Sequence, residues 1–211
     1  VEHRANFLSG YQNDAYARSY RAFVADIARQ AEGIPGGERF TRAVARYLFK
    51  LMAYKDEYEV ARLYTDGEFM QNLENTFVGD YRLKFNMAPP VFNLGLDDQG
   101  RPKKSEFGPW MYTALAMLTR LRFLRGTPLD PFGRTEERRH ERLLIDEYRS
   151  RITGLASRLT VGNLSVAVEI ASLPDEIRGY GPVKLESIRK TEEKLPRLIE
   201  LFETASAADA A

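Results

Sequence analysis

Acidic, basic and phenolic side chains crowd into the stretch LFKLMAYKDEYEVARLYTDG, which covers residues 48–67. Among them, Tyr54, Lys55, Glu57 and Tyr58 are of the types that donate and accept protons in enzyme active sites. Two interpretations are open: an acid–base site carried by these four residues, or a helix with one charged, solvated side. The first would need a cleft around the four side chains, which a sequence cannot show.

The apolar spacing of this region favours the helix. Apolar residues recur at alternating steps of four and three, as one side of a helix does: Phe40, Val44, Tyr47, Leu51, Tyr54, Tyr58 and Ala61. Lys55, Glu59 and Arg62 follow the same steps along another side, where each can pair with its neighbour. Such exposed pairs contribute only about 0.2–0.5 kcal/mol each and explain the charge density without catalysis. An independent enzyme is therefore the less favoured interpretation.

Similar rows predict a mainly α chain, a bundle of about six helices. Helical spacing recurs over residues 16–27, 40–61, 110–124, 145–159, 164–173 and 185–202. In the helix that follows Pro109, the predicted inward row is Trp110, Ala114, Met117, Leu121 and Leu124. Pro196 should bend or divide the last helix. We expect one domain over residues 1–204 and a frayed tail over residues 205–211.

A different period marks a small two-stranded β ribbon near residues 81–96. Tyr81, Leu83, Phe85 and Met87 alternate with polar residues, which is the two-residue repeat of a strand with one solvated face. Phe92, Leu94 and Leu96 are the candidates for the partner strand, and residues 97–100 carry a turn signal. The ribbon would lie between the predicted helices.

Composition excludes several classes of function. Of the 211 residues, 44% are hydrophobic, which is enough for one well-buried core. Lys and Arg total 31 against 30 Asp and Glu, so no global field draws the chain to nucleic acid or an anionic membrane. No apolar run approaches the roughly 18 residues of a membrane span, and no signal peptide is recognised. The valine at position 1 suggests a piece of a longer protein.

Ligand chemistry is equally restricted. There is no cysteine, which removes thiolate zinc sites, iron–sulfur ligation and thiol nucleophiles. His3 and His140 lack the spacing of metal ligands. Neither a dinucleotide-binding glycine motif nor a phosphate-binding loop occurs, and the G-D-G segment that holds magnesium in thiamine diphosphate enzymes is missing too. We therefore assign no catalytic, cofactor-binding or metal-binding residue in this chain.

Four segments together are specific to one family. They are LFKLMAYKDEYEVARLYTDGEF, KFNMAPP, FGPWM with LRGTPLDPFGRTEERR, and LPDEIRGYGPVK. In this order and at these intervals the chain resembles the C-terminal region of the long, single-chain indolepyruvate ferredoxin oxidoreductases, from about residue 7 to residue 202. The sequence departs from the family pattern at Asn86 and Pro182, where the family has histidine.

The resemblance implies a parent enzyme of known chemistry. Enzymes of this family are 2-oxoacid:ferredoxin oxidoreductases, which oxidatively decarboxylate aryl pyruvates to aryl-acetyl-coenzyme A. They use thiamine diphosphate with magnesium, an iron–sulfur cluster, and coenzyme A as co-substrate. By resemblance these cofactors belong to the preceding domains of the parent polypeptide, and the implied origin is the bacterial cytoplasm. The region that this chain resembles is an appended helical domain.

Two functional hypotheses follow. The leading one is a noncatalytic accessory domain that packs against the catalytic part of the parent enzyme or against a second copy of it. Candidate interface residues lie in two ordered loops and beside them, because aromatic and arginine side chains suit contact surfaces: Phe107, Trp110, Arg125, Phe132, Arg134, Arg178, Tyr180 and Lys184. The alternative is an anion- or partner-recognition module whose arginine-rich flanks bind the phosphates of coenzyme A or an acidic ferredoxin.

Overall fold

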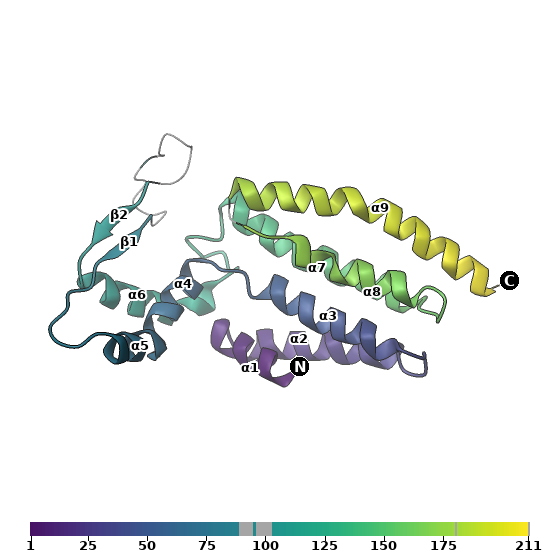
Figure 1. The fold of residues 1–211 in the computed structure, drawn as a ribbon, viewed down its shortest axis with the longest axis horizontal. Coiled ribbons are helices and arrows are strands. Elements are labelled where there is room, and N and C mark those ends of the chain that lie inside the picture. Colours follow the sequence, from purple (N-terminus) through teal and green to yellow (C-terminus); the bar gives the residue numbers. More distant parts are fainter. Residues whose placement is uncertain (89–94, 96–102, 180, 211) are drawn as a thin grey trace. The chain divides into compact units, whose positions relative to one another are not determined.

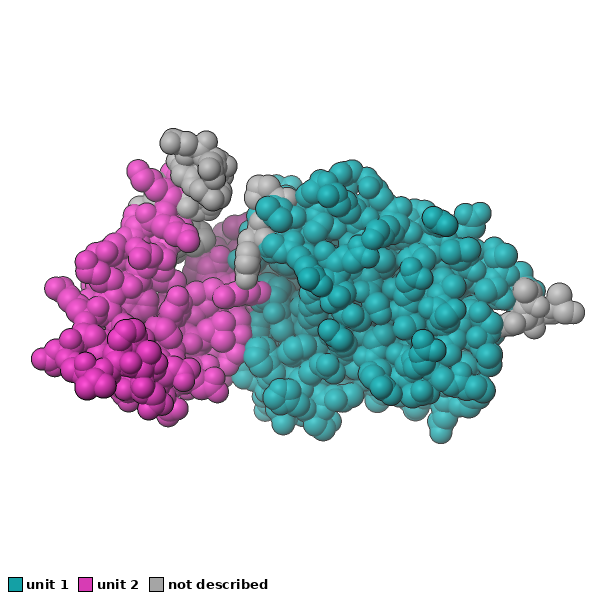
Figure 2. All heavy atoms as spheres, in the orientation of Figure 1, with its two compact units in different colours: residues 1–54, 136–211 teal, residues 55–135 magenta. Residues whose placement is uncertain are grey.

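The computed structural model describes residues 1–88, 95, 103–179 and 181–210. Within these residues there are nine α-helices and one two-stranded antiparallel ribbon (Figure 1), which confirms the predicted mainly α fold class. The structure has two compact units (Figure 2). Unit 1 comprises residues 1–54 and 136–211, and unit 2 comprises residues 55–135.

The described part of unit 1 contains six α-helices. They are α1 (Glu2–Tyr11), α2 (Asp14–Gln30), α3 (Gly37–Met52), α7 (Glu136–Ala156), α8 (Leu164–Ser172) and α9 (Pro182–Ala210), with a 3₁₀ turn, η3 (Leu173–Glu176), after α8. Helix α3 contacts α2, α7 and α8, and α9 packs on α8 and η3. Figure 1 shows α8 and α9 side by side. Unit 1 is thus a helical bundle organised around α3.

Local sequence signals determine where α2 and α3 begin. The Asn13 side chain accepts a hydrogen bond from the backbone nitrogen of Tyr16 (2.9 Å) and so caps α2. Before α3, Gly36 has φ of 82°, a left-handed conformation that favours glycine. A β-carbon on the next residue, Gly37, would overlap the carbonyl of Ala31. Gly36 and Gly37, at the start of α3, are therefore required by a close chain reversal.

Apolar side chains from all six helices form the core of unit 1. Its largest fully buried members include Phe40, Leu48, Ile152 and Phe202. Tyr11, Tyr20 and Tyr148 share this core, and each donates its hydroxyl to a main-chain carbonyl. Tyr148, for example, donates to the carbonyl oxygen of Ala171 at 2.8 Å. A buried hydroxyl without such a partner would cost about 1–3 kcal/mol.

Unit 2 is smaller and is built around a second core. Its described elements are α4 (Glu57–Thr65), α5 (Glu68–Thr76), β1 (Phe85–Met87), β2 (Ser105–Phe107), α6 (Trp110–Arg120) and the 3₁₀ turn η2 (Arg122–Leu124). Helix α6 packs on α4. The buried residues at this contact and under the ribbon are Ala61, Phe85, Met111 and Leu115.

The ribbon lies where the alternating pattern predicts its first strand. β1 pairs antiparallel with β2, in a register that sets Phe85 opposite Phe107. Lys84 and Glu106 form an exposed ion pair (2.8 Å) on this ribbon. The predicted partner strand at Phe92, Leu94 and Leu96 and the turn at residues 97–100 lie outside the described residues.

The single helix predicted over residues 40–61 is two helices in the structure. Helix α3 ends at Met52, and α4 begins at Glu57. Asp56 stands at the N-terminus of α4 and accepts a hydrogen bond from the backbone nitrogen of Glu59 (2.8 Å). An acidic residue followed three positions later by Glu is a helix-start signal, and it competes here with the apolar row that continues in register.

Helix α6 buries the face next to the one predicted, one residue along the helix. Its buried residues are Met111 and Leu115, whereas Trp110, Met117 and Leu121 of the predicted inward row are exposed. The helix is apolar on both sides, so its spacing alone does not select the buried face.

Helix α9 runs through Pro196 as one helix. Pro196 lies inside it and does not divide it, although the helix axis turns along its length in Figure 1. Buried residues flank the proline, with Ile188 before it and Leu198 and Phe202 after it, so packing holds both halves. The helix extends to Ala210. Alanine has the highest helix propensity, and extending an existing helix carries no nucleation cost.

Candidate functional site

The charged stretch of residues 48–67 contributes Asp56 to a buried ion pair in unit 2. Arg125 donates two hydrogen bonds to Asp56, from Nε to Oδ2 at 2.5 Å and from Nη2 to Oδ1 at 2.8 Å. Both side chains are only 3% exposed. The guanidinium also lies over the ring of Tyr58, 5.4 Å from its centroid. The two charges neutralise each other inside the unit.

Tyr58 is held as a neutral phenol by the same cluster. Its hydroxyl donates to Oδ1 of Asp130 (3.1 Å), and that carboxylate also accepts from the backbone nitrogens of Gly126 (2.8 Å) and Phe132 (3.0 Å). Burial, with the negative charge of Asp130, raises the pKa of Tyr58 far above its usual value. A phenol in this state cannot serve as a base near neutral pH.

Other residues of the stretch also have structural contacts. Arg62 pairs with Glu59 along α4, and Tyr54 belongs to unit 1. The Arg62 guanidinium donates to both carboxylate oxygens of Glu59 at 2.8 Å, and this hydrogen bonding raises the pKa of Arg62. Tyr54 belongs to unit 1, where its carbonyl accepts from the Tyr11 hydroxyl (2.7 Å). The contacts therefore support a structural role for Asp56, Tyr58 and Glu59.

The interface residues predicted in unit 2 have different environments. Phe107 and Trp110 meet edge to face, with ring centroids 5.9 Å apart. Phe132 is half-buried and packs edge-on against Tyr58, while Arg134 is exposed and donates to the carbonyl of Pro128.

Arg125 needs a correction as an interface candidate. It was predicted at a contact surface, but its side chain is buried and committed to Asp56. Its role is to hold the segment after α6 to the start of α4.

Unit 2 carries an exposed apolar row on α6. Trp110, Met117 and Leu121 follow at steps of seven and four, and so share one side of the helix. Their exposed fractions are 57%, 65% and 43%. Phe123 in η2 and Leu129 in the next loop are also exposed apolar residues. We call Trp110, Met117 and Leu121 the outer row of α6.

Two of the interface residues predicted in unit 1, Lys184 and Arg178, already contact carboxylates of that unit. Lys184 binds the buried carboxylate of Glu141. Arg178 is exposed and contacts Asp175 through its Nε, which donates to the carbonyl (3.0 Å), and its Nη2, which lies 3.4 Å from the carboxylate. Tyr180 lies outside the described residues.

Unit 1 also contains a cationic groove that the sequence did not predict. Arg4 comes from α1, Arg46 and Lys50 from α3, and Arg178 from the segment after η3. They line a hollow of about 560 Å³ together with Phe7, Tyr47, Phe49, Ala53 and Asp175. We call this hollow the cationic groove. It contains four cationic side chains against a single carboxylate, that of Asp175.

Lys50 is fixed within the cationic groove. Its Nζ donates to the carbonyl oxygens of Pro174 (2.7 Å) and Asp175 (3.0 Å). Burial lowers the pKa of Lys50, the negative charge of Asp175 opposes this, and nearby cations that include Arg178 and Arg46 lower it further. Burial is the largest of these causes.

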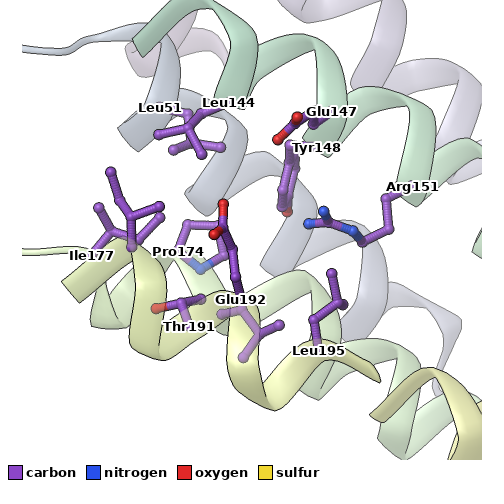
Figure 3. A pocket seen from close by; sticks show the side chains of 12 residues that line it. Leu51, Leu144, Glu147, Tyr148, Arg151, Pro174, Ile177, Thr191, Glu192 and Leu195 are labelled. Carbon is purple, nitrogen blue, oxygen red and sulfur yellow. The ribbon is translucent and has the colours of Figure 1, made fainter. Parts of the chain in front are cut away.

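A smaller cavity lies among α3, α7 and α9, and Figure 3 shows its lining. Apolar side chains such as Leu51, Leu144 and Leu195 surround it, and Glu147, Arg151 and Glu192 also contribute. Its volume of about 40 Å³ has room for a water molecule or two, not for an organic ligand. We assign it to imperfect packing.

Comparison with known proteins gives one match. A family model described as "Family of unknown function (DUF6537)" matches residues 1–197. The chain belongs to this family. No curated protein and no solved structure matches the chain.

The DUF6537 match takes in every candidate surface described above. It includes the whole of unit 2 and unit 1 as far as Arg197 in α9, so the outer row of α6 and the cationic groove both fall inside it. Within the described part of this DUF6537 chain, no three His, Asp or Glu side chains gather in a way that could hold a metal ion. No helix formed by these described residues has the length and apolarity of a membrane span.

One sequence signal could have pointed to the groove. Arg42, Arg46 and Lys50 recur at steps of four along α3, on a side that does not carry the buried apolar row. Arg4 and Arg178 could not have been added from spacing, because they lie far from α3 in the sequence and approach it only through the bundle.

Proposed function

We propose that this chain is a noncatalytic accessory domain of a longer enzyme that resembles the single-chain indolepyruvate ferredoxin oxidoreductases. In this proposal the domain docks onto the catalytic part of the parent polypeptide through the outer row of α6. The parent reaction, oxidative decarboxylation of an aryl pyruvate to an aryl-acetyl-coenzyme A, comes from the resemblance. A cytoplasmic location is part of the same proposal.

The outer row of α6 is the observation that carries the docking proposal. The helix uses Met111 and Leu115 for its own unit and leaves a second apolar side, headed by a tryptophan, exposed. Contiguous exposed apolar surface on a folded protein commonly marks an interaction site. Tryptophan is enriched among residues whose truncation costs an interface most of its affinity. Phe107 borders Trp110 and extends the same surface.

The proposed division of labour agrees with the chemistry of this chain's own side chains. An iron–sulfur cluster takes thiolate ligands, and the chain has no cysteine. Thiamine diphosphate and magnesium are assigned, by the resemblance, to other domains of the parent, and so is the site for coenzyme A. Asp56, Tyr58 and Arg125, which are types suited to catalysis, are instead bound to one another or to Asp130.

The proposal is tested by mixing the 211-residue chain with the remainder of the parent enzyme, expressed without this region. We expect the two to associate and the turnover of the remainder to change. Exchanging Met117 for Glu should weaken association at least tenfold, since a charge would be buried in an apolar contact. Val161, an exposed apolar residue of unit 1, provides the matched control as Val161→Glu.

Two results would count against the docking proposal. One is failure of the chain and the remainder to associate or to influence turnover. The other is an equal loss of association with Met117→Glu and Val161→Glu. If the chain instead binds a second copy of itself through the outer row, the partner in the proposal is replaced by that copy.

A second candidate function is anion recognition, the alternative raised by the arginine-rich sequence. The cationic groove favours it, because its cations outnumber its carboxylates. Coenzyme A phosphates and an acidic ferredoxin are the partners that the resemblance offers.

A further inference from the structure

We infer that the cationic groove of unit 1 binds a phosphate-bearing small molecule. This inference is independent of docking through α6 and deepens the second candidate function by naming a site and a ligand class. It rests on three features of the groove: unbalanced charge, a preorganised lysine, and a concave wall that combines cations with aromatic rings.

Charge is unbalanced in the groove. Some exposed arginines of the chain pair with carboxylates, as Arg29 does with Asp26 (2.8 Å) and Arg158 with Glu203 (2.6 Å). Among the described residues, no carboxylate lies within ion-pair distance of Arg4 or Arg46. Asp175, the single carboxylate of the groove, is shared with Arg178. An anion that entered the groove would therefore replace water around cations that have no protein carboxylate.

The floor of the groove is already ordered. Lys50 reaches it from α3 with its Nζ held by two main-chain carbonyls. An ammonium has three donors, so one remains for a ligand oxygen. Because the lysine is fixed before any ligand arrives, binding does not have to immobilise it.

The arginines suit phosphate in particular. A guanidinium offers a planar fork of donors that matches two phosphate oxygens, and arginine is favoured wherever phosphate is recognised. Arg4, Arg46 and Arg178 come from three separate segments and border one hollow, so they can approach a compact anion from different sides. A volume of about 560 Å³ lies within the usual range of small-molecule sites, about 300–1,000 Å³.

Aromatic rings form part of the groove wall and favour a ligand with an organic portion. Phe7 of α1 and Phe49 of α3 meet edge to face at 5.4 Å, and Arg4 lies 5.9 Å from the Phe49 ring centroid. An acidic protein would spread its charge over a broader surface than this hollow. The geometry therefore favours a phosphate ester over an acidic protein partner.

Calorimetric titration of the whole chain tests the inference. The probes are pyrophosphate, ADP and poly-L-glutamate, at low ionic strength and again at physiological salt. The variants are Arg46→Gln and Arg178→Gln, whose side chains are exposed, and the matched control is Arg29→Gln on α2. Far-UV circular dichroism verifies that each variant keeps its helices.

We expect pyrophosphate and ADP to bind and each groove variant to lose at least tenfold in affinity, since hydrogen bonds to charged groups are among the strong ones. The control should bind as the wild type does, and added salt should weaken binding. Tighter binding of ADP than of pyrophosphate would identify a phosphate ester as the ligand, and equal binding would identify a free phosphate.

Three results would overturn the inference. They are no binding of either phosphate probe, equal loss of binding in the groove variants and in Arg29→Gln, and tighter binding of poly-L-glutamate than of both phosphates. The last would replace the inferred ligand with an acidic protein. None of them affects the docking test, because the outer row of α6 belongs to unit 2 and the groove to unit 1.

Discussion

Breaking the ion pair between Asp56 and Arg125 should selectively destabilise unit 2. In Arg125→Met the carboxylate of Asp56 would lose two hydrogen bonds, at 2.5 and 2.8 Å, while remaining almost fully buried. Leaving one buried charge without its partner costs about 3–5 kcal/mol of unfolding free energy. The exposed pair of Arg29 and Asp26 is the matched control, and Arg29→Gln should cost at most about 1 kcal/mol.

A double-mutant cycle separates the ion pair from the helix cap. Asp56→Asn removes the charge but keeps a side-chain oxygen that can accept from the backbone nitrogen of Glu59. The double variant with Arg125→Met removes both charges of this pair, so it should be less destabilised than either single variant. We expect a coupling free energy of at least about 2 kcal/mol, because these neighbours are in direct contact.

Urea unfolding can follow unit 2 by itself. Trp110 is the single tryptophan of the chain and lies in unit 2, in contact with Phe107, so its fluorescence reports the loss of that unit. With an m value of about 1–1.5 kcal/mol per molar urea, the fluorescence midpoint of Arg125→Met should fall by about 2 M or more. Circular dichroism should retain a transition from unit 1 near the wild-type midpoint. A loss below about 1 kcal/mol, or no coupling in the cycle, would refute the conclusion that this pair holds the segment after α6 to the start of α4.

Three further predictions concern packing and hydrogen bonds in the two units. Gly133→Ala should destabilise unit 2 by about 1–3 kcal/mol in the fluorescence assay, because the added β-carbon would overlap the Asp130 carboxylate; an unchanged midpoint would contradict this. Above pH 10 the stability of unit 2 should fall: the raised pKa of Tyr58 lets the unfolded state ionise first and bind fewer protons, at up to about 1.4 kcal/mol per pH unit. Midpoints at pH 8 and pH 11 should differ less in Tyr58→Phe than in the wild type. Tyr16→Phe should cost unit 1 about 1 kcal/mol in thermal unfolding by removing the hydrogen bond to the Met52 carbonyl (3.0 Å), and a cost of zero would mean that water replaces this bond.

Helix periodicity in the sequence predicted most of the bundle, because a long apolar stripe at helical spacing is typical of a helix with one buried face. The rows over residues 16–27 and 145–159 correspond to buried faces of α2 and α7. Periodicity did not show the break between α3 and α4, since the apolar register runs on unchanged through it. The capping signal at Asp56 and Glu59 was the informative feature.

The candidate surfaces were predicted less well, for physical reasons. Helix α6 has apolar residues on two sides, and only the packing on α4 decides which side is buried. Arg125 has the composition of an interface residue, yet a single carboxylate, Asp56, draws it into the core. The cationic groove joins α1, α3 and the segment after η3, which the chain brings together only when the bundle forms.

The order of segments along the chain constrains how this protein is synthesised. Both ends of the sequence contribute to unit 1, whereas unit 2 is one continuous segment. A ribosome therefore delivers all of unit 2 before α7, α8 and α9 can reach α3. Closing a loop of roughly 80 residues costs on the order of 4 kcal/mol in chain entropy, and a folded unit 2 would shorten that loop in advance. Variants that weaken the smaller unit should consequently delay assembly of the larger one even where they touch none of its residues.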